Sequence, residues 1–89
     1  MNHQWDPEKA ARNLGKHGID FADAVGLFED AWALTIKEEY VEGEQRLATL
    51  GTDFLARVLV VVYTYRGGEI RLISARGATK KERGVYERK

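Results

Sequence analysis

The spacing of hydrophobic residues changes once along the chain, from a helical period to a period of two. Up to residue 28, apolar side chains recur at intervals of three and four residues, which is typical of one face of a helix. Asp6 followed by Pro7 is a typical helix start, and Gly18 suits the left-handed position after a helix end. We therefore expect a first helix between them. A second helix is expected to start after Asp20, with an apolar face formed by Phe21, Ala24, Val25 and Phe28.

Beyond residue 32, hydrophobic and polar residues alternate, which predicts strands over residues 32–37, 46–51, 57–65 and 70–76. The centre of the third strand, 58–62, is apolar at every position, so we expect a central strand that is covered on both faces. The acidic stretch 38–44 predicts a turn or an exposed hairpin loop. Gly67 with Gly68 predicts a tight hairpin between the last two strands.

The order of these elements predicts the fold class. The connections between strands are too short for parallel crossovers, which favours an antiparallel meander. We therefore expect an α+β fold with two N-terminal helices packed on one face of a four-stranded antiparallel sheet, plus a short C-terminal helix. No linker or repeat interrupts the pattern, so residues 1–89 are expected to form a single domain.

The stretch 69–86 predicts a strand that ends in arginine and is followed at once by a basic helix. Thr79 lies three residues before Glu82, so the two side chains are expected to form a capping box at the start of that helix. Arg76 ends the preceding strand. The helix carries the cations Lys80, Lys81, Arg83, Arg88 and Lys89. This concentration of positive charge suits a partner that carries phosphate groups.

Composition narrows the classes of function. Cysteine is absent, and neither a metal-ligand cluster nor a phosphate-binding glycine loop is present, so we expect no cofactor and no metal. The longest apolar run is far shorter than the ~20 residues that span a membrane, and we expect a cytoplasmic protein without a membrane partner.

The formal net charge of +0 conceals an asymmetry between two segments. Residues 66–89 carry eight Lys and Arg against three Asp and Glu, whereas residues 20–53 carry two against nine. The basic segment suits nucleic acid and the acidic segment suits a basic protein. Solvated charge without any partner is the alternative.

Arginines within strands are the main candidates for catalysis, because an unpaired charge is costly to bury. Arg46 and Arg76 are expected either to contact phosphate or to form structural pairs with Glu44, Glu69 or Glu82.

Cleavage of RNA without a metal requires few groups. A base takes the proton of the 2′-hydroxyl, a cation stabilises the charge on phosphorus, and an acid protonates the leaving 5′-oxygen. Glu44, Glu82 and His17 are candidate bases, although His17 also suits the negative end of the first helix. Candidate stacking surfaces for a base, each otherwise explained as half-buried packing, are Tyr63, Tyr65 and Tyr86.

Three segments together carry a family resemblance. The first, WDPEKAARNLGKHGIDFADA, covers residues 5–24 and contains the run Lys16, His17, Gly18. The second is GEQR at residues 43–46, and the third is RLISARGATKKERGVYE at residues 71–87. In this order they resemble the BrnT family of toxins over essentially the whole chain.

The resemblance implies a RelE-like fold and a metal-independent endoribonuclease that inhibits translation as the toxin of a type II toxin–antitoxin pair. The implied partners are RNA, cut on or off the ribosome, and a ribbon-helix-helix antitoxin similar to BrnA, through which alone the chain meets operator DNA. The acidic stretch 38–44 is expected to form part of the antitoxin contact, on charge grounds. The alternatives are a non-catalytic nucleic-acid or protein-binding module and a chain that serves mainly as half of a repressor complex.

Resemblance and charge together give two sets of predicted site residues. The predicted catalytic residues are Arg46, Arg76, His17 and Glu82. The predicted RNA-binding residues are Lys16, Lys80, Lys81, Arg83 and Tyr86.

Overall fold

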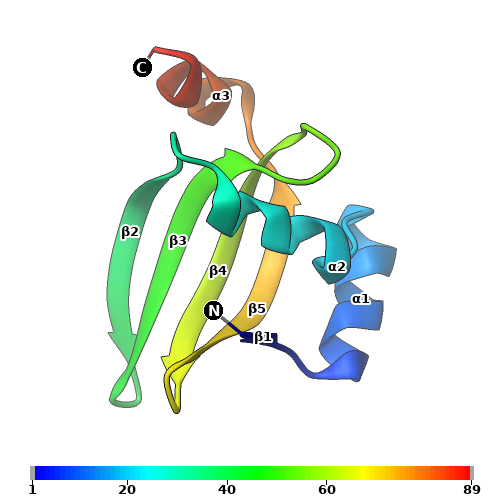
Figure 1. Cartoon of the computed structure of the whole chain (residues 1–89), viewed down its shortest axis with the longest axis vertical. Coiled ribbons are helices and arrows are strands. Elements are labelled where there is room, and N and C mark those ends of the chain that lie inside the picture. The colour runs from blue at the N-terminus through cyan, green and yellow to red at the C-terminus, as the bar shows by residue number, and fades with distance from the viewer. Residues whose placement is uncertain (1, 89) are drawn as a thin grey trace.

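One mixed sheet with the strand order β1-β5-β4-β3-β2 organises the chain in the computed structural model, which describes residues 2–88 (Figure 1). Lys89, expected in the last helix, lies outside the described residues. The four long strands form the expected antiparallel meander. The strands are β1 (His3–Gln4), β2 (Leu34–Val41), β3 (Glu44–Thr52), β4 (Val58–Arg66) and β5 (Glu69–Gly77).

The expected four-stranded antiparallel sheet is wrong in one respect, because β1 adds a fifth strand that runs parallel to β5. Its two residues are opposite Ile70 and Arg71. Two residues are too few to show an alternating pattern, so this pairing had no local signal. Side-chain hydrogen bonds from Asn2 and Gln4 to the carboxylate of Glu69 hold the segment in place (3.2 and 2.7 Å).

The first helix begins and ends where its caps predicted. Helix α1 covers Pro7–His17, the side chain of Asp6 accepts the backbone N–H of Glu8, and Gly18 adopts a left-handed conformation (φ 71°). These caps are local interactions, so the sequence alone is enough to locate them.

Only the first part of the second expected helix is α-helical. It is α-helical over α2 (Phe21–Ala24) and continues as the 3₁₀ helix η1 (Val25–Glu29). The carbonyl of Asp23 accepts the backbone N–H of Phe54, which belongs to the β3–β4 connection (3.2 Å). Phe54 lies so close to Gly26 that a Cβ atom there would be 2.5 Å from its backbone nitrogen. This close approach is the reason for glycine inside the helix.

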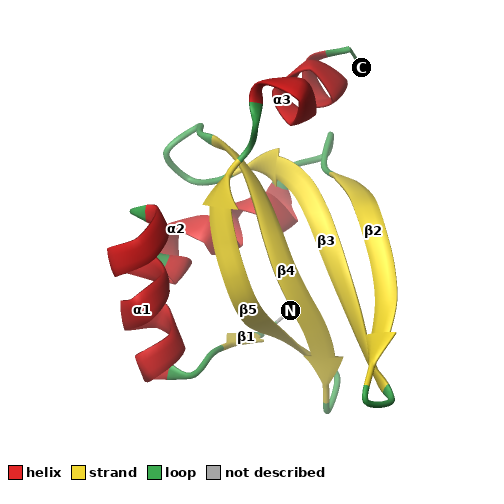
Figure 2. Ribbon diagram, turned by 180° about the vertical axis from the view of Figure 1, so that it is seen from behind, coloured by secondary structure: helices red, strands yellow, loops and turns green. Residues whose placement is uncertain are grey.

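The N-terminal helices cover one face of the sheet (Figure 1). Phe21 and Leu27 pack there in a core with Leu59, Val61 and Leu72. The opposite face carries no helix except α3 (Lys80–Glu87), which lies at one end of the strands (Figure 2).

The expectation that β4 is covered on both faces is therefore wrong, because no layer of helices in the described part of the chain packs along β4 on the open face. Val60, on the open face, is nevertheless only 2% exposed, and Val62 is half-buried. Val60 lies between Leu50 and Arg76 on the neighbouring strands. Neighbouring side chains thus shield the continuous apolar run of β4 where no helix does.

The acidic stretch 38–44 contains the expected hairpin turn, but the turn is shorter than expected and most of the stretch is strand. Strand β2 continues to Val41 and β3 starts at Glu44, so the turn contains only Glu42 and Gly43, both with positive φ (52° and 78°). β2 is an edge strand whose side chains are mostly exposed. Charged residues are well tolerated in such a strand, and this is why the acidic run was misleading.

Asn13 of α1 acts as a partner for the outer edge of β5. Its side-chain amide donates to the carbonyl oxygens of Ala75 (2.8 Å) and Ile19 (3.0 Å), and its Oδ1 accepts the backbone N–H of Ala75 (3.0 Å). Asn13 is only 6% exposed. The side chain therefore satisfies backbone groups that a neighbouring strand would otherwise bind.

Candidate active site

One of two contacts that join helix α3 to the rest of the fold is an arginine–carboxylate pair between Arg76 of β5 and Glu82 of α3. The capping box is present as expected, with the Thr79 hydroxyl accepting the N–H of Glu82 and the Glu82 carboxylate accepting that of Thr79. The same carboxylate accepts hydrogen bonds from both terminal nitrogens of Arg76 (2.8 and 3.0 Å). The hydrogen bond from Arg76 is the main cause that lowers the pKa of Glu82 to about 2.

A second contact joins the other end of α3 to Asp30, at the end of η1. The hydroxyl of Tyr86 donates to Oδ2 of Asp30 (2.6 Å). The same oxygen accepts the backbone N–H and the hydroxyl of Thr52 (2.9 and 3.1 Å). The hydrogen bond to Asp30 raises the pKa of Tyr86. Tyr86, expected to contact RNA, thus has its hydroxyl engaged in docking α3.

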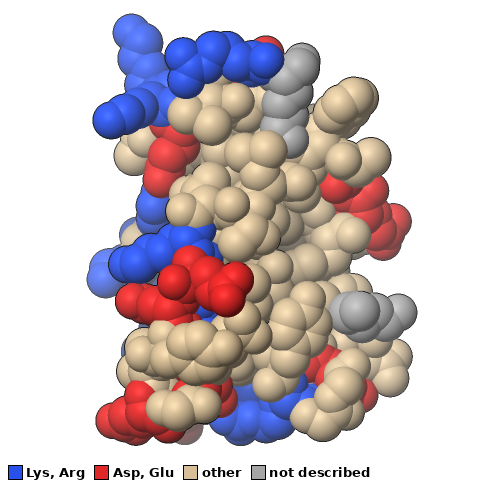
Figure 3. Space-filling view, turned by 90° about the vertical axis from the view of Figure 1, so that its left-hand side faces the viewer, with Lys and Arg blue, Asp and Glu red and all other residues tan. Residues whose placement is uncertain are grey.

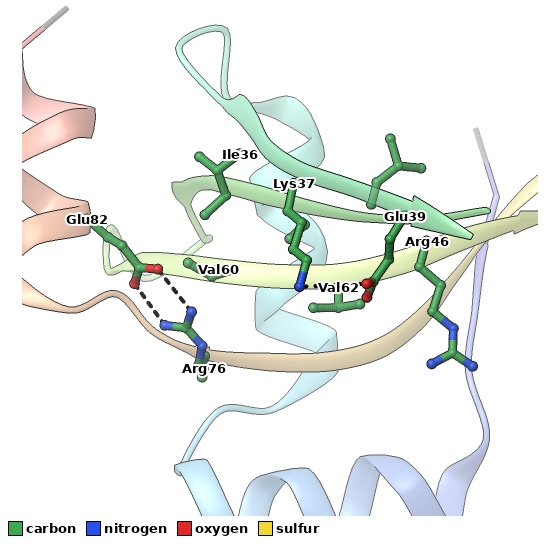
Figure 4. Close-up of a pocket in the computed structure, with 10 residues that line it drawn as sticks. Ile36, Lys37, Glu39, Arg46, Val60, Val62, Arg76 and Glu82 are labelled. Carbon is green, nitrogen blue, oxygen red and sulfur yellow. Dashed lines mark hydrogen bonds and ion pairs between the residues drawn. The ribbon is translucent and has the colours of Figure 1, made fainter. Parts of the chain in front are cut away.

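A cavity of about 350 Å³ lies on the open face beside α3 (Figure 4). Its floor is formed by small and branched apolar residues, among them Val60 and Val62. Five charged side chains line it: Lys37, Glu39, Arg46, Arg76 and Glu82. The cavity therefore brings together three of the four predicted catalytic residues, Arg46, Arg76 and Glu82.

Arg46 and Arg76 lie at opposite ends of this cavity (Figure 4). In the sheet, Arg76 is opposite Val60 and Arg46 is opposite Thr64, four residues further along β4. Four residues of strand correspond to roughly 13 Å. The two guanidinium groups are therefore positioned to contact different parts of a ligand.

The two arginines differ in how their charges are compensated. Arg76 forms the bidentate pair with Glu82, as the structural alternative predicted. Within residues 2–88, the carboxylate of Glu44 lies 3.7 Å from the Nε of Arg46, and this buried nitrogen has no hydrogen-bond partner. The Arg46 side chain is 35% exposed. The partly exposed guanidinium group of Arg46 is therefore less compensated than that of Arg76 and is available to bind an oxyanion in the cavity.

His17 is not brought to this cavity. It lies exposed in the last turn of α1 and lines a separate hollow of about 290 Å³ beside β5. Lys9, Arg12 and Lys16 line the same hollow. The predicted catalytic set is thus divided, with His17 at one edge of the sheet beside Lys16, a predicted RNA contact.

The other residues predicted to contact RNA or to stack on a base lie on α3 and on β4. The exposed residues Lys80, Lys81 and Arg83 are on α3, and Figure 3 shows basic side chains gathered at that end of the molecule. Tyr63 is buried in the core with its hydroxyl bonded to Thr49 (2.8 Å), so it cannot stack on a base. Tyr65 is exposed.

Lys37 and Glu39 line the cavity although sequence reasoning did not select them. Lys37 was expected at the end of a strand and Glu39 in the following turn or hairpin loop. Both lie in β2 and point to the same face, with 3.6 Å between their charged atoms. Charged residues two positions apart at a strand end are the signal that could have found them. Among residues 2–88, no group of three or more His, Asp and Glu side chains could hold a metal ion.

Acid is expected to loosen the attachment of α3. The Glu82 pKa of about 2 lies below the ordinary value of 4.5, so its contribution to stability is complete above about pH 4.5 and is lost as the pH falls toward 2. NMR shifts of the α3 amides, followed from about pH 6 to 2, should report this change. The variant Glu82→Gln should already show the loosened state at neutral pH. Identical α3 shifts at both ends of the wild-type titration would contradict the prediction.

Comparisons with known proteins identify the family and support the fold. The sequence model of the family described as "Ribonuclease toxin, BrnT, of type II toxin-antitoxin system" matches residues 5–82. The structure is similar to the crystal structure of the Brucella abortus ribonuclease toxin BrnT, with a TM-score of 0.66 and 26% sequence identity. That match covers 90% of this chain and 99% of the Brucella chain. The comparison with curated proteins finds no match. No helix within residues 2–88 is long and apolar enough to span a membrane.

Proposed function

Because this chain belongs to the BrnT family of ribonuclease toxins from type II toxin–antitoxin systems, we propose that it cleaves RNA in the cavity on the open face of its sheet. The reaction proposed is attack of a ribose 2′-hydroxyl on the adjacent phosphate, without a metal ion. Cleavage of mRNA in the cytoplasm would inhibit translation. A ribbon-helix-helix antitoxin would neutralise the toxin and link it to operator DNA.

The observation that carries this proposal is that Arg46 lines a cavity that also contains a lysine and two carboxylates, and that no residue within 2–88 forms a hydrogen bond with its Nε. The Arg46 side chain is 35% exposed, so a phosphate oxygen in the cavity would contact the accessible part of its guanidinium group. Its negative charge increases as the 2′-oxygen attacks, so Arg46 would stabilise the transition state more than the substrate.

Glu39 is the best candidate for the general base. The Glu82 carboxylate already accepts hydrogen bonds from Arg76 and Thr79, and its pKa of about 2 makes it a weak base at neutral pH. Glu39 lines the same cavity, with the Lys37 ammonium 3.6 Å from its carboxylate and Arg46 opposite it on β3. We therefore assign proton abstraction to Glu39 and give Glu82 the task of holding Arg76.

The remaining cations would bind the rest of the RNA strand. Lys37 is placed to protonate the leaving 5′-oxygen or to stabilise its charge. Lys80, Lys81 and Arg83 of α3 would contact phosphates beyond one end of the cavity. Lys16 and His17, at the hollow beside β5, would bind a more distant part of the strand and take no part in proton transfer.

A charge-removing substitution tests the role of Glu39. Glu39→Gln is expected to lower kcat for RNA cleavage about 10²- to 10⁴-fold with KM nearly unchanged, since general-base assistance contributes an effect of this size. Glu42→Gln, which removes an exposed carboxylate from the adjacent turn, is the matched control and should retain full activity. Activity of Glu39→Gln within about tenfold of the wild type would contradict the assignment.

The second candidate is a module that binds RNA without cutting it. The observation in its favour is the Arg76–Glu82 pair, which compensates one of the two catalytic arginines. Wild-type protein that binds RNA tightly and leaves it intact under all conditions would favour this module over an enzyme.

A further inference from the structure

We propose that the outer edge of β2 is the docking site of the antitoxin, which adds an extended, basic segment of its own chain to the sheet as a further strand. This inference rests on the proposed function, because it identifies the partner as the antitoxin. Its evidence is independent and comes from the backbone, the exposed side chains and the charges of β2.

The first observation is that the two edges of the sheet are treated differently. The outer edge of β5 is occupied at Ile70 and Arg71 by β1, and at Ala75 by the side chain of Asn13. Strand β2, at the other edge, runs for eight residues with only β3 beside it. An uncovered edge of this length is a ready template for pairing with another chain.

The turn of the β2–β3 hairpin identifies which backbone groups point outward. Val41 is opposite Glu44 across a two-residue turn, so this pair closes the hairpin with hydrogen bonds. Hydrogen-bonded and non-hydrogen-bonded pairs alternate in antiparallel strands. The next pairs along therefore leave the N–H and C=O groups of Tyr40 and Glu38 directed away from β3. These are the groups that an added strand would bind.

The side chains of this edge favour a protein partner. Ile36 is 41% exposed and Tyr40 is 70% exposed, so both would gain from burial against another chain. The edge strand and its turn carry Glu38, Glu39 and Glu42 against the single cation Lys37. This excess of negative charge attracts a basic peptide segment.

The position of the edge also explains how docking would neutralise the enzyme. Ile36, Lys37 and Glu39 belong to β2 and line the cavity proposed as the active site. A strand added to β2 would bring its own side chains across the rim of this cavity. RNA and the antitoxin would then be mutually exclusive ligands.

Proline at position 38 tests the strand addition most directly. Glu38→Pro removes an N–H that β3 does not use, so the sheet is retained, but it blocks pairing at the outer edge. Calorimetric titration with the purified cognate antitoxin should show Kd raised at least about tenfold, the effect of one lost hydrogen bond together with a steric clash. The matched control Glu38→Gln removes only the charge and should change Kd by less than about threefold.

A second pair of variants covers the case in which proline disturbs the fold. Tyr40→Lys should weaken antitoxin binding, because it removes an apolar contact and repels a basic segment. Tyr65→Lys makes the same change at another exposed tyrosine, on β4, and should leave binding unchanged. In cells, Glu38→Pro and Tyr40→Lys should still arrest growth and should no longer be rescued by the antitoxin.

Failure of this inference is distinguishable from failure of the proposed function. Equal antitoxin affinity for all four variants, no antitoxin binding by the wild type, or dimerisation of the toxin alone through this edge would each overturn the docking site. A wild-type chain that binds antitoxin but cuts no RNA would refute the enzyme. The calorimetric comparison would still decide the docking site in that case.

Discussion

Arg46→Ala is expected to lower the rate of RNA cleavage at least about 10²-fold while the protein remains folded. Preorganised donors that stabilise transition-state charge typically contribute 10²- to 10³-fold, and the buried Nε of Arg46 has no hydrogen-bond partner within the described chain. Single-turnover cleavage with saturating enzyme measures this loss, and circular dichroism checks the fold. Induced expression should correspondingly lose growth arrest and RNA fragmentation.

The matched control for Arg46 is Arg66. Both arginines pair with Glu44, at 3.7 Å for Arg46 and 3.0 Å for Arg66, but Arg66 ends β4 and does not line the cavity. Arg66→Ala should therefore cleave RNA at nearly the wild-type rate. Equal rates for the two alanine variants would remove Arg46 from the active site.

Arg76→Ala should also lose cleavage, for a combined reason. The substitution removes a cation from the cavity, and it leaves the Glu82 carboxylate without its bidentate partner beside α3. The NMR shifts of α3 would therefore change in Arg76→Ala and stay unchanged in Arg46→Ala. This difference separates an arginine that positions a helix from one that acts on the ligand alone.

The largest effect on stability is expected at Asn13. Asn13→Ala would leave the N–H and C=O of Ala75 and the C=O of Ile19 buried without partners. Each unsatisfied group costs about 1–3 kcal/mol, so we expect the free energy of unfolding to fall by about 3–5 kcal/mol. Urea unfolding at fixed pH measures the change. For a domain of this size, such a loss is a large part of the total stability.

Asn2 provides the control for Asn13. It also hydrogen-bonds toward β5, through Glu69, but at an exposed position (3.2 Å). Asn2→Ala should change the free energy of unfolding by less than about 0.5 kcal/mol. A loss below 1 kcal/mol in Asn13→Ala would mean that water or a backbone shift replaces the amide.

The features that the sequence predicted correctly depend on neighbouring residues. The caps of α1, the capping box of Thr79 and Glu82, and the Gly67–Gly68 hairpin each involve residues within a few positions of one another. Family membership was also recognisable, because the matching segments retain their order along the chain. Local chemistry was therefore sufficient for the elements and for the class of protein.

The features that were missed depend on contacts distant in sequence. β1 exists because His3 and Gln4 meet β5 some 67 residues away, as the Gln4–Arg71 hydrogen bond shows. Glu39 was expected in a turn or hairpin loop because a run of acidic residues is typical of one. An edge strand also tolerates such charge, and Glu39 lies in one. The separation of His17 from Arg46 and Arg76 follows from the packing of α1 beside β5. Spacing along the chain carries no signal for this arrangement.

Cleavage of a defined RNA by the purified chain in the presence of EDTA tests the central claim most directly. The account predicts that cleavage continues at the same rate, and that the products carry a 5′-hydroxyl on one side and a 2′,3′-cyclic phosphate on the other. These ends follow from attack by the ribose 2′-hydroxyl. Loss of cleavage in EDTA, or products with 5′-phosphate ends, would contradict a metal-independent reaction on the open face of the sheet.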